Sequence, residues 1–162
     1  MNTWWVTAND NSAGRNGGWH WDQFLCPRQP RKKAYPWGGP EWIRSPQSRA
    51  LIAKMRRGDL VVAYQSSVGV VGFARLATDG YPRDGGVGAD CFDLKPSGSL
   101  RLESPVPYSV VRTLPAADEH FGFVKFNQGT VFRVSREGRR RLGLLAAAFN
   151  PRLARRCAAL TK

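Results

Sequence analysis

The sequence predicts one α+β domain whose strands curl into a small barrel flanked by helices. Its 162 residues are the size of a single ordinary domain, and 42% hydrophobic and 23% charged residues are typical of a globular protein. Two neighbouring runs, 59–65 and 68–76, are almost continuously apolar, which indicates strands buried on both faces. Ser45 followed by Pro46 is typical of a helix start.

The elements before residue 59 are assigned from local signals. The β-branched and aromatic segment 3–8 predicts a first strand, and the turn-forming residues of 9–18 predict a loop. Segment 19–25 suits one helical turn, whereas 27–40, with four prolines and a basic triplet, is expected to be irregular and exposed. The helix that begins at Ser45 has an apolar stripe and is expected to end near Gly58.

The elements after residue 59 follow from the same signals. The two apolar runs are expected to pair as strands through a short serine turn, and the glycine-rich segment 79–88 after them is expected to be a loop. The remaining segments are predicted as strands at 89–94 and 99–102, a helical turn at 105–114, a strand pair within 124–134, and helices at 135–149 and 150–160.

The net charge of +13 is the strongest functional signal in the composition. Such a charge attracts polyanions, of which nucleic acid is the usual partner and an anionic membrane surface the less common one. Nine basic residues but only one acidic residue lie in 133–162, so the basic excess is greatest in this stretch. A solvated basic tail is the alternative interpretation of the same residues.

Membrane-spanning, secreted and disulfide-rich proteins are not expected. The sequence contains no apolar run of about 18 residues, and its first residues lack the basic and apolar regions of a signal peptide. The three cysteines, Cys26, Cys91 and Cys157, are widely scattered and form no CxxC pair. This pattern favours a reducing compartment, and we expect a cytoplasmic protein.

The chemistry-bearing residues give little support to catalysis. His20 and His120 are about a hundred residues apart, and the sequence has no phosphate-binding loop, HExxH or GxSxG motif. His20 and Asp22 suggest half of a metal site at most, and Cys26 an isolated nucleophile. We therefore expect no metal and no cofactor. A nucleic-acid-processing enzyme is the least favoured function.

All six tryptophans lie in the first 42 residues. Tryptophan is enriched where a flat ring contacts a ligand, so this concentration predicts that some of the rings line a binding surface. Because strand neighbours face opposite ways, one of Trp4 and Trp5 is expected in the core and the other in a cleft. Trp37 and Trp42 flank a Gly-Gly-Pro segment, and at least one of these rings is expected to project into the cleft.

A set of motifs resembles those of the EVE domain family. The motifs occur in the family's order, as R-[NS]-x-Q-[AS]-R at 44–49, GDLV at 58–61, YQS at 64–66, VVGFA at 70–74, Tyr-Pro at 81–82 and a glutamine-containing segment at 128–132. The resemblance covers residues 1 to about 135. It implies a PUA-like β-barrel, related to YTH and ASCH domains. The basic segment 136–162 extends beyond the resemblance, and we expect it to form helices packed on the same domain.

The resemblance also implies a function, because EVE domains are regarded as readers of modified bases in DNA or RNA, in bacteria among others. We therefore expect a non-catalytic module that stacks a modified, for example methylated, base in an aromatic pocket. The candidate pocket residues are Trp5, Trp37, Trp42, Ser45, Gln47, Tyr64, Ser66 and Tyr81. The candidate contacts to phosphate or sugar are Arg44, Arg49, Lys125, Arg139, Arg140, Arg141, Arg155 and Arg156.

Several of these assignments have a structural alternative. Trp5 and Tyr64 alternatively pack the barrel, Ser45 alternatively caps a helix, and Arg49 alternatively pairs with Asp59. The main alternative function is a general PUA-like RNA-binding protein that requires no modification. In either case the expected partner is nucleic acid and not a membrane, and the expected state is a monomer.

Overall fold

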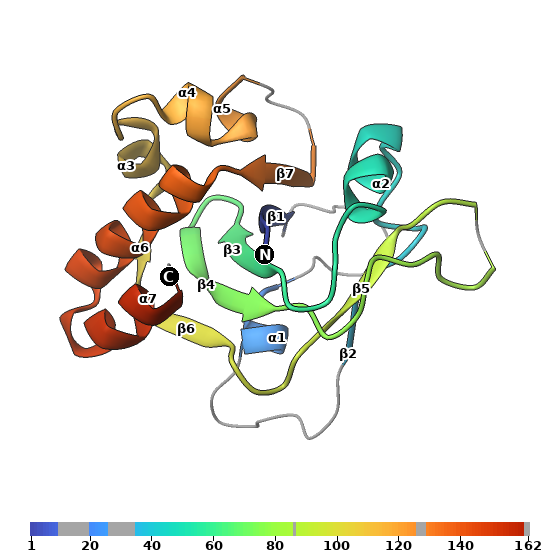
Figure 1. The fold of residues 1–162 in the computed structure, drawn as a ribbon, viewed down its shortest axis with the longest axis horizontal. Helices are drawn as coiled ribbons and strands as arrows, with labels where there is room; N and C mark the ends of the chain where they lie inside the picture. Colours follow the sequence, from blue (N-terminus) through green and yellow to red (C-terminus); the bar gives the residue numbers. More distant parts are fainter. Residues whose placement is uncertain (10–19, 26–34, 86, 126–128, 161–162) are drawn as a thin grey trace.

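The strands form two sheets, of five and two strands, in a computed structural model that describes residues 1–9, 20–25, 35–85, 87–125 and 129–160 (Figure 1). The larger sheet has the order β6-β4-β3-β1-β7. Its strands are β1 (Thr3–Ala8), β3 (Leu60–Gln65), β4 (Gly69–Arg75), β6 (Leu100–Val106) and β7 (Val131–Val134).

The pairing of the strands determines how the chain must connect them. β1 and β3 are parallel, whereas the other pairs of the larger sheet are antiparallel. A parallel pair needs a crossover connection, which residues 9–59 supply. Within that crossover, β2 (Tyr35–Gly38) pairs antiparallel with β5 (Cys91–Leu94) to form the smaller sheet. A bridge between Leu76 and Leu94 connects β5 to the chain that leaves β4.

The helices lie in the crossover, between β6 and β7, and after β7. Their bounds are α1 (Asp22–Leu25), α2 (Pro46–Ile52), α3 (Tyr108–Arg112), α4 (Ala117–His120), α5 (Gly122–Lys125), α6 (Arg136–Phe149), the 3-10 turn η1 (Pro151–Leu153) and α7 (Ala154–Leu160). Ser45 and Ser135 cap α2 and α6 through their Oγ atoms, as the sequence predicts. No described helix is long and apolar enough to cross a membrane.

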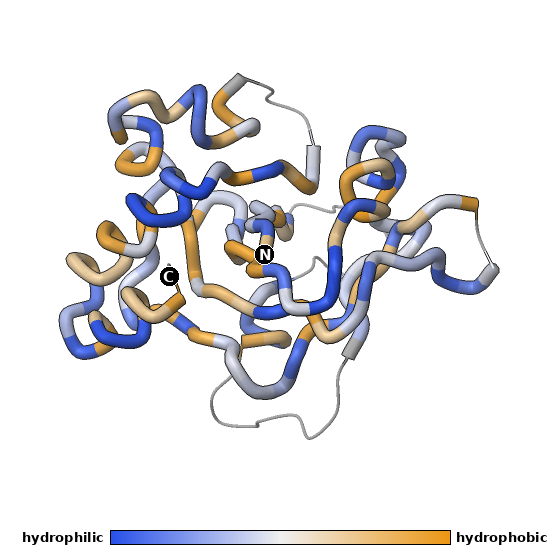
Figure 2. The backbone as a smooth tube through the Cα atoms, viewed as in Figure 1, coloured by the Kyte–Doolittle hydropathy of each residue, from blue (hydrophilic) through white to orange (hydrophobic). Residues whose placement is uncertain are grey.

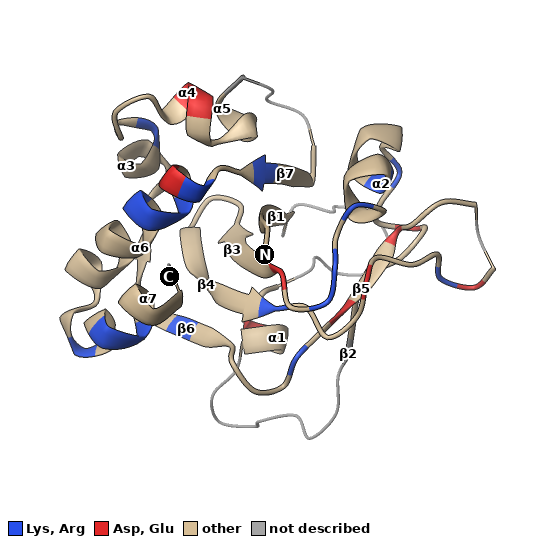
Figure 3. Ribbon diagram, viewed as in Figure 1, with Lys and Arg blue, Asp and Glu red and all other residues tan. Residues whose placement is uncertain are grey.

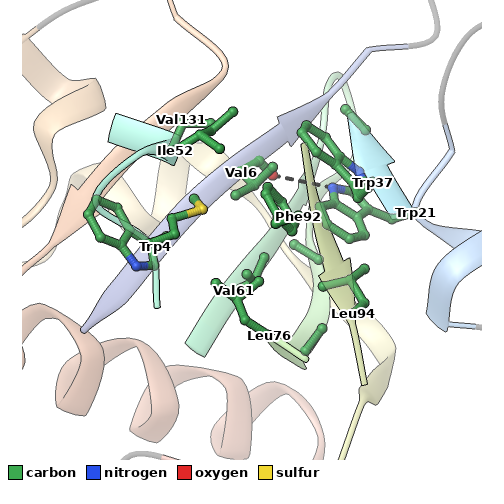
Figure 4. Close-up of a cluster of buried hydrophobic side chains, with 14 of the residues drawn as sticks. Trp4, Val6, Trp21, Trp37, Ile52, Val61, Leu76, Phe92, Leu94 and Val131 are labelled. Atoms are coloured by element: carbon green, nitrogen blue, oxygen red, sulfur yellow. Dashed lines mark hydrogen bonds between the residues drawn. The ribbon is translucent and has the colours of Figure 1, made fainter. Parts of the chain in front are cut away.

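The larger sheet buries hydrophobic side chains on both faces, because strand neighbours face opposite ways. We call the cluster on the side of β2 and β5 the sheet-side core; it includes Trp4, Val6, Trp21, Trp37, Val61 and Phe92 (Figure 4). We call the cluster on the side of α3 to α7 the helix-side core; it includes Trp5, Val62, Phe73, Phe121, Leu142, Ala146 and Cys157. In Figure 2, hydrophilic and hydrophobic stretches alternate along α6 and α7, as expected of helices with one buried side.

Trp4 and Trp5 follow the predicted alternation, but neither faces a cleft. Trp4 lies in the sheet-side core and Trp5 in the helix-side core, and they are only 2% and 1% exposed. The expectation that one ring would face a cleft is wrong, because both faces of β1 are covered. Trp4 Nε1–H donates to Asp59 Oδ2 at 2.8 Å, so its polar atom keeps a partner inside the protein.

The α+β class and most predicted elements are confirmed, and three differences have tertiary causes. β2 forms where an irregular segment was expected, because Trp37 pairs with Phe92 on β5. Residues 124 and 125, where a strand was expected to begin, belong to α5, and Phe123 of this helix packs with its ring centroid 3.9 Å from that of Trp5. α2 ends at Ile52 and not near Gly58; the Arg56 N–H, which would continue it, donates to Asp59 Oδ2 at 3.1 Å.

The carboxyl-terminal helices pack on the same sheet as the preceding residues. Leu142 and Ala146 of α6 and Cys157 of α7 belong to the helix-side core together with Trp5 of β1. Figure 1 shows α6 and α7 side by side along the edge of the molecule that carries β6. A domain boundary at residue 135 stays a prediction.

Candidate nucleic-acid interface

The aromatic residues predicted to form one pocket lie on opposite faces of the larger sheet. Trp5 belongs to the helix-side core and the half-buried Tyr64 packs against it, with the two rings stacked at a centroid distance of 4.8 Å. Trp37 and Trp42 belong to or pack against the sheet-side core. The structure therefore does not bring Trp5 and Tyr64 together with Trp37 and Trp42.

Trp37 is an interior residue of the sheet-side core. Its ring stacks on Trp21 at 5.6 Å and on Phe92 at 5.0 Å, with interplanar angles of 12° and 14°. Only 3% of Trp37 is exposed. Trp21 in turn donates its Nε1–H to the carbonyl of Val6 at 3.2 Å, which ties the stack to β1 (Figure 4). The stack supports the chain around it and leaves Trp37 with almost no surface for a ligand.

Trp42 is the half-buried tryptophan that the same segment presents at the surface. Gly38 and Gly39 have φ values of +100° and +135°, which glycine adopts without strain. The Gly39 carbonyl then accepts the N–H groups of Trp42 at 3.1 Å and Ile43 at 2.9 Å, closing a turn. Ile43 is buried, whereas Trp42 lies at the rim of the sheet-side core. The turn therefore fixes one side chain inside and its neighbour at the boundary with solvent.

Arg83 lies near Trp42, in a segment that the sequence predicts only as a loop. A Cβ atom on Gly39 would lie 3.5 Å from Arg83 Nη1 and 3.9 Å from Trp42 Cδ1, so the guanidinium and the indole both lie close to Gly39. Buried Asp90 accounts for this placement: its carbonyl accepts Gly39 N–H and its Oδ1 accepts Arg83 N–H, both at 2.9 Å. The Tyr-Pro motif directly before Arg83 is the signal that could have identified it.

The start of α2 adds polar groups next to Trp42. Ser45 Oγ accepts Ser48 N–H at 3.4 Å and donates to Gln47 Oε1 at 2.8 Å. The amide nitrogen of Gln47 is a further donor on this exposed side chain. Arg44 is also exposed, with its Nε–H donating to the Glu41 carbonyl at 3.2 Å.

Arg49 has a structural contact, but not the predicted one with Asp59. Its Nε–H donates to the Ile43 carbonyl at 2.8 Å and so supports the turn that carries Trp42. The Asp59 carboxylate instead accepts from Trp4 Nε1–H and from the backbone N–H groups of Asn2 and Arg56. Burial alone raises the pKa of Asp59, but these hydrogen bonds outweigh it and lower the pKa below its ordinary 3.8.

Ser66 and Tyr81 are held by other contacts within the protein. Ser66 is half-buried at the end of β3, where its N–H donates to the Ala8 carbonyl at 2.9 Å. Tyr81 donates its hydroxyl to Asp93 Oδ1 at 2.6 Å. Burial, and then this hydrogen bond, raise the pKa of Tyr81 far above its ordinary value. Tyr81 is therefore engaged within the protein.

Comparison with known proteins identifies the fold. No protein-family model and no curated protein matches the sequence. Solved structures do match. Rpa0253 from Rhodopseudomonas palustris matches at 23% identity with a TM-score of 0.67, covering 92% of this chain and 93% of that one. Atu2648 from Agrobacterium tumefaciens matches at 19% identity with a TM-score of 0.69, covering 91% of this chain and 92% of that one. The DUF55 domain of human thymocyte nuclear protein 1 matches at 14% identity, TM-score 0.64, covering 90% of this chain and 97% of that one. A structure of human THYN1 in complex with 5-methylcytosine containing DNA matches at the same identity and TM-score, over 91% and 97%.

This chain has the EVE (DUF55) domain fold. The expected fold is thereby confirmed, since these likenesses extend over nine-tenths of the chain.

The predicted phosphate contacts of this EVE fold are arranged in three ways. Arg140 and Arg141 on α6 both donate to Glu137, at 2.8–2.9 Å, and their guanidinium groups lower the pKa of that carboxyl to about 2. Arg155 and Arg156 are exposed on α7, and Figure 3 shows basic residues at the start of α6 and on α7. Arg139 is buried. The side chain of Lys125, the last residue of α5, lies outside the described residues.

Catalytic candidates are not brought together in the described part of the EVE fold. The described residues contain no group of three His, Cys, Asp or Glu side chains that could hold a metal ion. His20 is exposed, and Cys26 lies outside the described residues. Cys91 is buried, and burial raises the pKa of its thiol, which disfavours the reactive thiolate.

Proposed function

We propose that this protein is a non-catalytic module that binds nucleic acid and reads a modified base. The observation that carries the proposal is the likeness, over 91% of the chain, to human THYN1, whose structure was solved in complex with 5-methylcytosine containing DNA. The net charge of +13 supports it, because such a charge attracts polyanions and speeds their encounter.

The base is placed against Trp42 in this proposal. Trp42 is half-buried, so its ring is held by the sheet-side core while part of its surface stays open. A base taken out of its stack loses stacking energy, and an aromatic side chain returns about 1–3 kcal/mol of it. Ser45 and Gln47, a few residues away, supply hydrogen-bonding groups for the edge of the base.

The phosphates next to that base are assigned to exposed cations near Trp42. Arg83 reaches the same glycine as the indole, and Arg44 lies two residues from Trp42. A guanidinium binds phosphate through two parallel hydrogen bonds, so it fixes the strand without reading its sequence. The exposed Arg155 and Arg156 on α7 add attraction that does not depend on sequence.

The modification is recognised through the apolar area that it adds. One buried methyl group contributes about 0.8 kcal/mol, which corresponds to about fourfold in affinity. Larger discrimination requires a pocket that leaves no room for water around the methyl group.

The test is a binding panel measured by fluorescence anisotropy. Matched DNA and RNA oligonucleotides carry cytosine or 5-methylcytosine, and adenine or N6-methyladenine, at one position. We expect at least one modified strand to bind at least about fourfold more tightly than its unmodified partner. Equal affinity for every modified and unmodified pair would overturn the reading of a modified base and leave a general RNA- or DNA-binding protein. Absence of binding to every strand would overturn the nucleic-acid function itself.

A further inference from the structure

A polar pocket of about 430 Å³ lies at the start of β1, the end of β7 and the first turn of α6. Asn2, Arg133, Arg136 and Arg139 are among its lining residues. β1 has six residues, so at about 3.3 Å per residue its two ends lie about 17 Å apart. The helix α2 lies near the other end, because Thr130 links its Ser48 to Thr7: Thr130 N–H donates to Ser48 Oγ at 3.3 Å, and Thr7 N–H donates to the Thr130 carbonyl at 2.8 Å. The pocket is therefore separate from the surface around Trp42.

Arg139 is a buried cation that lines this pocket. It is 6% exposed, and its Nε–H has no hydrogen-bond acceptor in the part of the chain that the structure describes. Burial lowers the pKa of Arg139, and the nearby positive charges of Arg136 and Arg75 lower it further. A buried N–H group of a cation without an acceptor is unfavourable, so this arrangement favours the arrival of an anion at the pocket.

The carboxylates near this region are already engaged. Glu137, in the first turn of α6, accepts from Arg140 and Arg141 and is not among the lining residues. Asp59 accepts from Asn2 N–H at 2.7 Å and is bound by Trp4 and Arg56 as well. No Asp or Glu is among the residues described as lining the pocket. The charge on Arg139 therefore has no described carboxylate partner there.

The other groups around the pocket have the same electrostatic preference. Arg133 Nη2–H donates to Asn2 Oδ1 at 3.1 Å, which holds this guanidinium at the pocket, and Arg136 is exposed beside it. Ser135 caps α6, a helix of 14 residues, so the positive end of its dipole and its first N–H groups lie at the same place.

We propose that this pocket binds a phosphate group. Planar guanidinium groups match the oxygens of a phosphate in pairs, and three of them together with a helix start complement its charge. A cavity of this volume is within the range of small-molecule sites, so it takes the phosphate together with part of the group that carries it. The phosphate comes from one of two sources, the backbone of a bound nucleic-acid strand or a free phosphate monoester. The proposal does not depend on the reading of a modified base.

The test compares the full-length protein with Arg139→Met in phosphate-free buffer. Replacing an unpaired buried cation by an apolar side chain of similar length is expected to leave the melting temperature unchanged or to raise it. Inorganic phosphate is then titrated at constant ionic strength, and melting temperature and 31P NMR line width are followed. We expect phosphate to raise the melting temperature of the wild type and broaden its 31P signal, with affinity at least about tenfold weaker in the variant.

Lys54→Gln is the matched control, because it removes one positive charge from an exposed residue outside both sites. It is expected to keep the wild-type response to phosphate. An equal response of the wild type and Arg139→Met, or no response of the wild type, would overturn the proposal. A large fall in melting temperature of Arg139→Met without phosphate would also overturn it, because Arg139 would then be a structural residue.

Oligonucleotides distinguish the two sources. If the backbone of a strand supplies the phosphate, Arg139→Met weakens the binding of a single-stranded oligonucleotide that has no terminal phosphate. The same oligonucleotide then competes with inorganic phosphate for the pocket. If a free monoester supplies it, the oligonucleotide binds both proteins equally, and adenosine monophosphate competes with inorganic phosphate in its place. Either result supports a phosphate pocket, and neither depends on whether methylated strands are preferred.

Discussion

Replacing Trp42 and Trp37 separately by alanine tests the assignment of the base-stacking ring. Trp37 is 3% exposed and stacks on Trp21 and Phe92, so Trp37→Ala should cost about 3–5 kcal/mol of folding free energy. At about 2–4 °C per kcal/mol for a protein of this size, its melting temperature should fall by about 6–20 °C. Trp42 is only half-buried, so Trp42→Ala should cost about 1–2 kcal/mol.

For nucleic-acid binding, in contrast to stability, Trp42→Ala is the substitution expected to have the direct effect. Trp42→Ala should weaken the binding of the preferred oligonucleotide by about 1–3 kcal/mol, which is a loss of affinity of about 5- to 160-fold. Melting curves and anisotropy titrations on both variants decide the assignment, and Trp37→Phe is the folded control because it keeps an aromatic ring in the stack. Normal binding by a folded Trp42→Ala would refute the reasoning and place the base elsewhere, for example beside Tyr64 on the helix side.

Three more perturbations test other parts of the structure. Arg83→Gln should weaken the binding of all oligonucleotides alike and reduce the salt dependence of the affinity by about one phosphate contact, with Lys54→Gln as the control. Loss of discrimination between modified and plain strands would contradict this role. Wild-type affinity should fall steeply between low and moderate salt, as anisotropy titrations will show, and an unchanged dissociation constant would contradict the electrostatic argument. Asp59→Asn should lower stability at pH 7 by about 1–3 kcal/mol in urea melts, since an amide offers fewer acceptors to Trp4, Asn2 and Arg56. Because its pKa is lower in the folded state, Asp59 stabilises the fold above about pH 4 and ceases to do so as the pH falls; a variant with the wild-type acid profile would contradict this.

Local patterns were sufficient for much of the fold. The apolar runs that became β3 and β4, and the serine caps of α2 and α6, depend on residues within a few positions of one another. Where contacts between distant residues decide the structure, the predictions differ from it. β2 requires β5, about 55 residues later, and the end of α2 requires the side chain of Asp59.

The candidate site shows the same division in its individual residues. The motifs in the sequence were enough to predict an EVE-type fold. The nucleic-acid partner and a site in the segment from Trp37 to Arg49 stay predictions. Only the tertiary structure separated Trp37, stacked in the interior, from Trp42 at the rim, and brought Arg83 to the same glycine.

Arg139 is the clearest case of what the sequence alone did not distinguish. In the sequence it is one of three consecutive arginines on a basic helix. In the structure two of them pair with Glu137, whereas Arg139 is buried at the start of β1 without a described partner for its Nε–H. The sequence determined the number of charges and the helix that carries them. Their environments depend on which elements the fold packs against each face of that helix, and that is decided only when distant strands come together.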